Sequence, residues 1–239
     1  MVGPTTRTDL WVVIPAYNEM ATVAGVVSGA LEHARCVVVV DDGSSDATAE
    51  RARLAGATVL SLSVTLGAWG ATQAGLLFAL MQGADMVIAM DADGQHLAQE
   101  IPTLVQALAA GADVVVGASP MRASWQRRCA WSYLRTLSGL RVQDLTSGFR
   151  GYSRRAMHLL TGQDAALLNY QDLGVLLLIS HHHLQISEVP VRMMKRGDGG
   201  SRIFHSWWRV GVYLIESTVL CLSAGLWGRR LGGLSGRGL

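Results

Sequence analysis

The sequence predicts an α/β fold in which a mostly parallel β-sheet carries helices on both faces. Short apolar runs rich in Val alternate with longer segments of helical periodicity through the first half of the chain. The apolar runs are nearly continuous, which is typical of strands that are buried on both faces. Half of the 239 residues are hydrophobic and only 16% are charged, which excludes a disordered chain and allows a large core.

Five strands and four helices are expected to alternate in the first half of the chain. The strands are expected at residues 10–15, 37–41, 58–62, 86–90 and 114–117, and the helices at 20–33, 46–56, 70–82 and 98–110. Beyond them we expect a basic, Trp-containing helix at 125–138, a helix at 170–181 and a strand at 184–191. The triplet His181-His182-His183 is interpreted as the end of a helix, since neighbouring residues on a helix point in different directions.

The basic residues gather in two stretches, although the net charge is only +2. The first stretch holds Arg122, Arg127, Arg128, Arg135, Arg141, Arg150, Arg154 and Arg155, and the second holds Arg192, Lys195, Arg196, Arg202 and Arg209. Such clusters suit an anionic ligand, and a solvated surface is the alternative. The three cysteines are far apart in the sequence, which favours free thiols in a reducing compartment.

The C-terminal part differs from the rest in pattern. Residues 203–224 are apolar with a helical period but are interrupted by Arg209 and Glu216, so they do not form a spanning segment. We expect a main domain at residues 1–202 and an amphipathic helix with a flexible tail at 203–239. This helix either lies in a membrane interface or packs on the main domain. No signal peptide is expected at the N-terminus.

Acidic residues follow two of the expected strands, where ligands bind in open α/β sheets. Asp41 and Asp42 follow the second strand, and carboxylates there can accept hydrogen bonds from a ribose or a base. Asp91 and Asp93 follow the fourth strand, and Gln95 stands two residues later. Oxygen ligands of this kind suit Mg²⁺ or Mn²⁺, which can stabilise a departing diphosphate. A calcium loop is disfavoured because its full pattern is absent.

Glycine-containing segments complete the candidate site. The segment Thr65-Leu-Gly67-Ala-Trp-Gly70-Ala-Thr-Gln-Ala-Gly75 opens a helix and allows either close approach of a ligand or close helix–sheet packing. Gly148-Phe149-Arg150 and the segment from Arg196 to Arg202 each set a cation beside glycine, as in loops that clamp phosphate oxygens.

Together these motifs resemble family 2 glycosyltransferases, in particular the branch that contains dolichyl-phosphate mannose synthase and bacterial polyprenyl-phosphate glycosyltransferases. The resemblance runs from about residue 11 to residue 202, in the family's order: Val13-Ile-Pro15-Ala-Tyr17-Asn-Glu19, Asp41-Asp42-Gly-Ser, Asp91-Ala92-Asp93-Gly-Gln95-His96, Asp144-Leu-Thr-Ser147-Gly148-Phe-Arg150 and Arg196-x-x-Gly-x-Ser201-Arg202. It implies a GT-A, Rossmann-like fold and a nucleotide-sugar donor.

The resemblance also implies roles for single residues. Nucleotide-sugar binding falls to Pro15, Tyr17, Glu19, Asp41, Asp42, Gly67, Asp91 and Ala92. The metal ligands are Asp91, Asp93 and Gln95, for Mg²⁺ or Mn²⁺. The motifs assign catalysis to Asp93, Asp172, Arg150, Arg196 and Arg202, and acceptor binding to Asp144, Ser147, Gly148 and Ser201. The first basic stretch adds Arg128 to the catalytic set and Arg122 and Arg127 to the acceptor-binding residues.

The chain departs from the family pattern at several points. Thr65 begins the segment where the family has Asn-x-Gly-x-Gly, which puts the donor contact there in doubt. Tyr170-Gln-Asp172 stands where relatives have Glu-x-Asp and leaves one acid. The two C-terminal membrane helices of some relatives are missing, so any membrane attachment is expected to be peripheral.

The expected reaction is a single inverting displacement. A hexose from GDP-mannose or a UDP-hexose is transferred to a polyprenyl phosphate at the cytosolic face of the membrane. A phosphate acceptor is already anionic and needs only orientation, whereas a hydroxyl acceptor would need a base such as Asp172.

A hydroxyl acceptor and a non-catalytic subunit remain alternatives. A pyrophosphorylase is disfavoured because residues 1–19 lack a basic Gly-rich loop. No nucleic-acid partner is expected, and the oligomeric state is open.

Overall fold

The computed structural model describes residues 10–119, 125–166, 168, 173–194, 215 and 218, without the side chains of 125–129. The strands are β1 Leu10–Ala16, β2 Cys36–Asp41, β3 Thr58–Ser61, β4 Met86–Ala89, β5 Val114–Ala118, β6 Arg150–Ser153 and β7 Ile186–Pro190. The helices are α1 Val23–Leu31, α2 Thr48–Leu54, α3 Gly67–Met81, η1 Ala98–Glu100, α4 Ile101–Ala109, α5 Trp125–Ser138, α6 Arg154–Leu160, α7 Gln163–Ala166 and α8 Leu173–His181.

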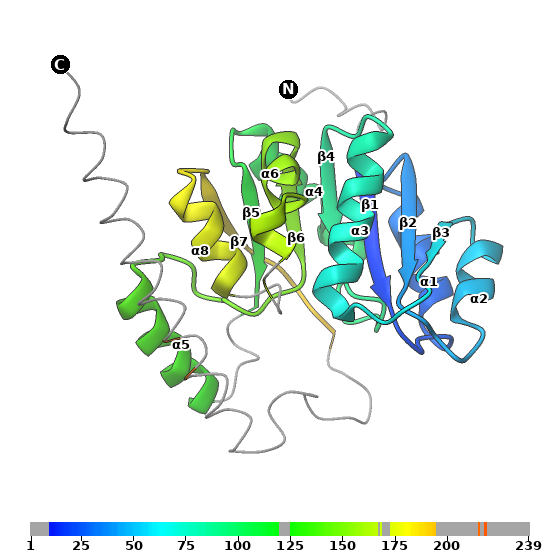
Figure 1. The fold of residues 1–239 in the computed structure, drawn as a ribbon, viewed down its shortest axis with the longest axis horizontal. Helices are drawn as coiled ribbons and strands as arrows, with labels where there is room; N and C mark the ends of the chain where they lie inside the picture. The colour runs from blue at the N-terminus through cyan, green and yellow to red at the C-terminus, as the bar shows by residue number, and fades with distance from the viewer. Residues whose placement is uncertain are drawn as a thin grey trace.

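The strands form one mostly parallel, seven-stranded sheet in the order β3-β2-β1-β4-β6-β5-β7 (Figure 1). β1 pairs in parallel with β2 and β4, β2 pairs in parallel with β3, and β5 pairs in parallel with β7. Only β6 runs antiparallel to its neighbours among the described strands, between β4 and β5. The predicted α/β fold with a mostly parallel sheet is therefore confirmed.

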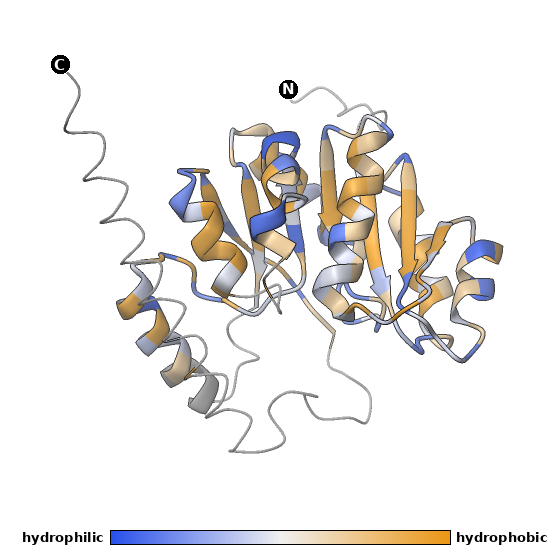
Figure 2. Cartoon of the chain, viewed as in Figure 1, coloured by the Kyte–Doolittle hydropathy of each residue, from blue (hydrophilic) through white to orange (hydrophobic). Residues whose placement is uncertain are grey.

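Two hydrophobic cores lie on the two faces of the sheet. Val13 belongs to the core under α3, α6 and α8, which cover the face toward the viewer in Figure 1. Its neighbours Val12 and Ile14 belong to the other core, with residues of α1 and α4. Because successive side chains of a strand point to opposite faces, continuous apolar runs follow directly from two covered faces. Figure 2 shows the apolar colour concentrated on the strands.

Helix α3 packs very closely on the sheet. A Cβ atom at Gly75 would lie 2.4 Å from Cγ1 of Val13 and 3.0 Å from Cγ2 of Val40. This contact shows that close helix–sheet packing accounts for Gly75, one of the two explanations considered for the small residues of this segment.

The elements β6, α6 and α7 were not expected from the sequence. β6 consists of Arg-Gly-Tyr-Ser, which contains neither an apolar run nor a regular alternation. It is a strand because β4 and β5 supply backbone partners on both sides, which overrides its weak local propensity. The predicted helix end at the histidine triplet is confirmed, since α8 ends at His181.

One described residue of the C-terminal region lies beside α5. The hydroxyl of Tyr133 in α5 is 3.3 Å from Oγ1 of Thr218. Trp131 and Leu134, on the same helix, are buried in the core beneath α3 and α8. Across the described residues, no helix has the length and apolar character needed to cross a membrane.

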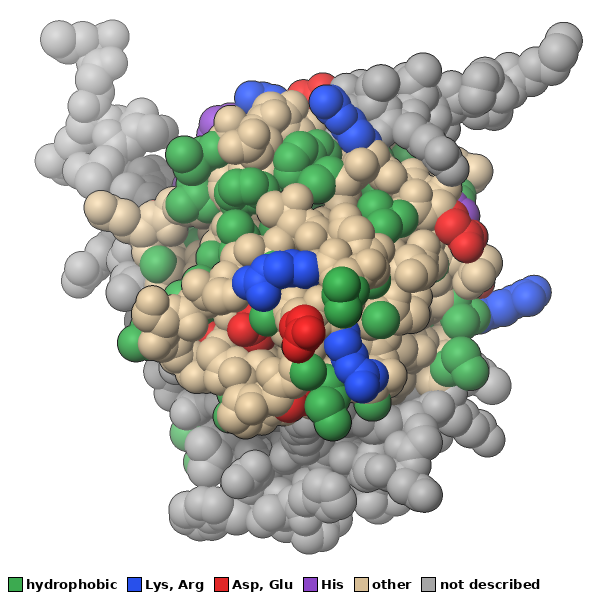
Figure 3. All heavy atoms as spheres, turned by 90° about the vertical axis from the view of Figure 1, so that its right-hand side faces the viewer, with side chains coloured by type: hydrophobic (Ala, Val, Ile, Leu, Met, Phe, Trp, Pro, Cys, Tyr) green, Lys and Arg blue, Asp and Glu red, His purple; other side chains and the backbone are tan. Residues whose placement is uncertain are grey.

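The surface on the α2 side of the molecule carries no strong charge of one sign. Figure 3 shows a few basic and acidic side chains there, scattered among apolar ones.

Candidate active site

The acidic loops and the Gly148 loop meet at one edge of the sheet. The parallel strands β1, β2 and β4 all end at this edge, which we call the carboxyl edge. β6 runs in the opposite direction, and Arg150 at its start pairs with Ala89 at the end of β4. The residues that precede β6 therefore reach the same edge as the residues that follow β4.

The turns after β1 and β2 are joined by hydrogen bonds. The N–H of Asn18 donates to Oγ of Ser44 at 2.9 Å, and the N–H of Ser45 donates to Oδ1 of Asn18 at 2.9 Å. Asn18 has a φ of 54°, a left-handed conformation that Asn tolerates better than most residues. The N–H of Glu19 donates to Oγ1 of Thr48 at 2.8 Å. These contacts fix the predicted nucleotide-binding turn before any ligand arrives.

The predicted nucleotide-binding residues of this turn differ in exposure. Tyr17 is exposed, and Pro15 and Glu19 are partly buried. Tyr17 therefore offers an aromatic surface to a ligand at the carboxyl edge.

Asp42 has a role that the sequence did not predict. Its Oδ1 accepts a hydrogen bond from the N–H of Leu66 at 2.7 Å, and its Oδ2 accepts one from the N–H of Gly67 at 2.9 Å. These N–H groups open α3, where a carboxylate is favourable because it pairs free donors and the positive end of the helix dipole. Asp42 is buried, so the structure uses it to hold α3 against β2.

Asp41 is also buried, and its Oδ1 accepts a hydrogen bond from the N–H of Ser44 at 3.2 Å. The structure thus shows both acids of the pair bound to the protein's own backbone. Their contacts with a ribose or a base stay predictions.

The loop after β4 presents oxygen ligands in a more open arrangement. The Asp91 side chain is 46% exposed, whereas Ala92 between the two acids is buried. The N–H of Gln95 donates to Oδ1 of Asp93 at 3.0 Å, and the amide of Gln95 also donates to Oδ2 of Asp93. The structure therefore brings Asp93 and Gln95 together, and their roles as metal ligands stay predictions.

This donor set suits a divalent cation that shares its coordination with a substrate. Within the described ranges, no three His, Cys, Asp or Glu residues gather into a closed metal cage. Two carboxylates and an amide oxygen match the hard ligands of Mg²⁺ or Mn²⁺ and leave positions for phosphate oxygens. The residues thus fit the predicted metal, with a substrate completing the site.

Gly148 lies directly against the Asp91 carboxylate. A Cβ atom at position 148 would be 2.8 Å from Oδ1 and 2.9 Å from Oδ2 of Asp91. Any larger residue would therefore displace the carboxylate. This contact explains in physical terms why glycine stands in the Gly-Phe-Arg motif, and it joins a predicted acceptor residue to a predicted metal ligand.

A pocket of about 170 Å³ connects the metal loop with the predicted acceptor loop. It is lined by Asp91, Gln95, His96, Ser119, Trp131, Asp144, Thr146, Ser147, Gly148 and Met193. Two predicted metal ligands and three predicted acceptor residues thus share one pocket. The structure brings together groups that lie 49 to 57 positions apart in the sequence.

The acceptor loop is held in place by residues that the sequence analysis did not single out. The Glu188 carboxylate accepts hydrogen bonds from the N–H of Asp144 at 2.8 Å and from the N–H of Gln143 at 2.9 and 3.0 Å. Ser147 is buried, and its hydroxyl donates to the carbonyl of Gly117 at 2.6 Å. The signal for Glu188 in the sequence was an acidic residue inside a predicted strand.

Arg150 requires a correction. We expected it to clamp phosphate oxygens, but its side chain is completely buried. Its Nε donates to the carbonyl of Ser147 at 2.8 Å, and an Nη donates to the carbonyl of Leu145 at 2.9 Å. The guanidinium therefore shapes the acceptor loop from beneath and presents no surface to a ligand.

The remaining predicted site residues lie outside the description, either entirely or in their side chains. They are Arg122, Arg127, Arg128, Asp172, Arg196, Ser201 and Arg202. The chain that leads to Arg196 is described as far as residue 194, where the N–H of Met194 donates to the carbonyl of Gln95 at 2.8 Å.

Comparisons with known proteins agree with this geometry. Residues 11–161 match the model of glycosyl transferase family 2. A polyprenol monophosphomannose synthase from Mycolicibacterium smegmatis is 31% identical over 224 residues, which cover 84% of this chain and 83% of that protein. An undecaprenyl-phosphate mannosyltransferase from Micrococcus luteus is 29% identical over 210 residues, covering 80% of this chain and 86% of that protein.

Among solved structures, the glucosyl-3-phosphoglycerate synthase of Mycobacterium tuberculosis is similar with a TM-score of 0.68. The match covers 90% of this chain and 79% of that one at 23% identity, which supports the GT-A fold. The sequence motifs, the shared pocket and the family match lead to one assignment: this chain belongs to glycosyl transferase family 2.

Proposed function

We propose that this enzyme is an inverting, metal-dependent glycosyltransferase that moves a hexose from GDP-mannose or a UDP-hexose to a polyprenyl phosphate. The main support is the pocket in which Asp91 and Gln95 face Asp144, Ser147 and Gly148. A leaving diphosphate and an incoming acceptor must meet at one carbon, so their binding groups must share one space. The relatives named above, whose names state polyprenyl-phosphate acceptors, support the choice of acceptor.

In this proposal the donor binds along the carboxyl edge. Its nucleotide lies against the joined turns after β1 and β2, where Tyr17 is exposed, and its diphosphate reaches Asp91, Asp93 and Gln95. A divalent cation held there would neutralise charge on the departing diphosphate. The preformed turns reduce the conformational freedom that binding must remove, which favours orientation of the donor for reaction.

The acceptor enters from the side of residues 144–149. A phosphate monoester is largely anionic at neutral pH, so it attacks without a general base once it is oriented. Arg122, Arg127, Arg128, Arg196 and Arg202, with Ser201, are proposed to orient it. If the acceptor were a hydroxyl, Asp172 would be the proposed base.

The proposal includes how the enzyme meets its lipid. Residues 1–202 form the catalytic domain, and residues 203–239 form an appended segment that attaches the enzyme peripherally to the cytosolic face of the membrane. A polyprenyl phosphate is a membrane lipid, so its phosphate must be reached at that surface. In the described part of this segment, the hydroxyl of Thr218 lies beside Tyr133 of α5.

Nucleotide release from a panel of UDP- and GDP-sugars tests the function, measured with and without Mn²⁺ and a polyprenyl phosphate in detergent. We expect release to require the metal, to select one donor and to rise strongly with the lipid phosphate. Release that ignores the lipid would support a hydroxyl acceptor. A folded protein that turns over no donor would support a non-catalytic subunit.

A further inference from the structure

His96 is a buried residue at the centre of the site to which the proposed reaction gives no role. Its side chain is 3% exposed, and it lines the pocket shared by the metal loop and the acceptor loop. It stands one residue beyond the last proposed metal ligand. Its contacts with the metal loop indicate a role in positioning the proposed metal ligands.

The imidazole of His96 contacts both the main chain and the side chain of Asp91. The N–H of Asp91 donates to Nδ1 of His96 at 3.0 Å. Nδ1 is therefore the unprotonated nitrogen, and in the neutral ring Nε2 carries the proton. Nε2 lies 3.8 Å from Oδ2 of Asp91. The His96 ring therefore contacts Asp91, the proposed metal ligand, at its backbone N–H and at its carboxylate.

The ring itself is held by the acceptor loop. His96 stacks on Phe149 with ring centroids 5.1 Å apart and an angle of 18° between the planes. The preceding residue, Gly148, is the one that lies against the Asp91 carboxylate. Residues 148–149 and His96 therefore enclose Asp91 from two sides.

A third segment joins at the same point. The backbone of His96 forms an antiparallel bridge with Met193, and the N–H of Met194 donates to the carbonyl of Gln95. The chain that continues to the predicted phosphate-binding segment from Arg196 therefore leaves from the metal loop itself. Three segments that are distant in sequence meet at His96.

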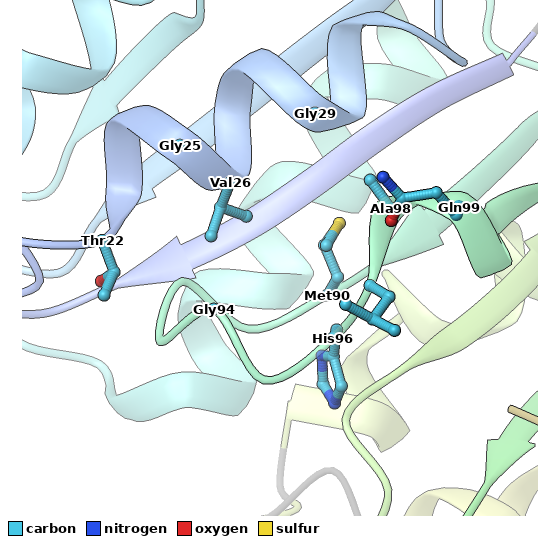
Figure 4. A pocket seen from close by; sticks show the side chains of 10 residues that line it. Thr22, Gly25, Val26, Gly29, Met90, Gly94, His96, Ala98 and Gln99 are labelled. Atoms are coloured by element: carbon cyan, nitrogen blue, oxygen red, sulfur yellow. The ribbon is translucent and has the colours of Figure 1, made fainter. Parts of the chain in front are cut away.

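The side of the metal loop that faces α1 borders a pocket. A pocket of about 250 Å³ lies between α1 and the metal loop, with His96 at one end and Thr22, Gly25 and Val26 along α1 (Figure 4). A Cβ at Gly94 would find its nearest neighbour, Cγ2 of Thr22, only at 3.9 Å. Side chains of α1 do not fill this space, so the contacts of His96 are among those that hold the loop in place.

We propose that His96 is a positioning residue, which fixes Asp91 for metal binding and ties that ligand to the acceptor loop and to the chain before Arg196. This inference rests on the proposed metal-dependent reaction. Residues that orient a metal ligand typically contribute about 10- to 100-fold to metal affinity or activity. His96 acts through Asp91 and does not itself bind the ion.

Two variants of the chain distinguish the effect of the Nδ1 hydrogen bond of His96 from the effect of its ring stacking. His96→Phe keeps an aromatic ring that can stack on Phe149 but removes the acceptor for the Asp91 N–H. His96→Asn loses the ring but places an oxygen near the position of Nδ1. His182→Phe is the matched control, because His182 is exposed just beyond α8.

The measurement is the Mn²⁺ dissociation constant in the presence of GDP or UDP, by electron paramagnetic resonance, with kcat and KM recorded as Mn²⁺ is varied. We expect His96→Phe to weaken Mn²⁺ binding by about 10- to 100-fold. His96→Asn should bind nearer to the wild type, and His182→Phe should equal it. Raising Mn²⁺ should restore much of the kcat of His96→Phe, which a general loss of structure would not allow.

Equal Mn²⁺ affinity in His96→Phe and the wild type would overturn the inference. Equal losses in His96→Phe and His96→Asn would also overturn it, because the ring alone would then be responsible. A wild type that binds no Mn²⁺ with either nucleotide would instead contradict the proposed function, so the two failures are distinguishable.

Discussion

The two acidic loops at the carboxyl edge use the same side chain in opposite ways. After β2, Asp42 is buried, and each of its carboxylate oxygens accepts a backbone N–H at the start of α3. After β4, the Asp91 carboxylate is 46% exposed and opens into the pocket shared with the acceptor loop. One acid therefore builds the scaffold, and the other is available to a ligand. Position after a strand does not by itself make a carboxylate catalytic; its hydrogen-bond partners decide.

The largest expected effect lies in the second loop. Asp93→Asn should lower kcat/KM by about a thousandfold or more, since a bound metal contributes several kcal/mol to transition-state stabilisation. The thermal unfolding temperature should stay near that of the wild type. Asp85→Asn is the control, because Asp85 lies before β4, away from the carboxyl edge, and is paired with Arg154 at 3.2 Å. Equal activity of the two variants would remove the metal loop from the mechanism.

Asp42→Ala tests the first loop through stability. It leaves two N–H groups of α3 without their acceptor, which should lower the free energy of unfolding by about 2–4 kcal/mol. Chemical denaturation measures this change. Asp85→Ala removes an exposed ion pair and should change stability by less than about 0.5 kcal/mol. Matching values for the two variants would show that Asp42 does not brace α3.

Gly148→Ala tests the contact between the loops. The added methyl would meet the Asp91 carboxylate at 2.8 Å, so the carboxylate or the acceptor loop must move. A displaced Asp91 carboxylate would be misoriented for metal binding, and we expect at least a tenfold loss of metal-dependent turnover. Gly25→Ala is the matched control, because a Cβ there meets nothing within 4 Å. Undiminished turnover in Gly148→Ala would show that Asp91 can be displaced harmlessly.

Glu188→Gln tests how the acceptor loop is held. The amide keeps the shape of the side chain but weakens its charge-assisted hydrogen bonds to Gln143 and Asp144, at a cost of about 1 kcal/mol. We expect KM for the lipid acceptor to rise while KM for the donor stays unchanged. Steady-state kinetics with each substrate varied in turn would check this, and a rise in donor KM alone would contradict it.

The smallest effect concerns pH. The hydrogen bond from Thr48 is the main cause that holds the pKa of Asp46 below its ordinary value of 3.8. A lowered pKa adds stability above 3.8, and that stability is lost as the pH falls through the folded-state value. In Asp46→Asn, the free energy of unfolding should therefore fall slightly less between neutral and acidic pH than it does in the wild type. Denaturation curves at several pH values would show whether the wild type and the variant converge in acid.

Much of the fold could be predicted because its strands are apolar runs with a simple pattern. The strands from β1 to β5 and the helices between them were expected near their observed positions, since burial on both faces leaves a strong signal. β6 could not be predicted, because its neighbours and not its own residues make it a strand. Its direction in turn decides that Gly148 reaches the edge where Asp91 lies.

The sequence predicted those parts of the site in which a short motif contains the functional residues themselves. The pairing of Asp93 with Gln95 is local, and the motif indicated both. Arg150 was wrongly expected to clamp phosphate, because a sequence does not show that an arginine is buried under its own loop. Glu188 and His96 were missed as supports since their contacts join residues that only the folded sheet brings together.

The direction of β6 has a consequence for how such an enzyme can be altered. The turns proposed for the donor belong to residues 10–97, and the described acceptor residues belong to 114–194, with α4 between them. The proposed donor-binding residues therefore precede the acceptor-binding residues in the sequence. A chimera that joins this chain to a relative within residues 110–113 should take the acceptor preference of the relative and keep the donor preference of this chain. Such a graft must preserve contacts that cross the junction, among them those of Gly148 with Asp91, Phe149 with His96 and Met194 with Gln95.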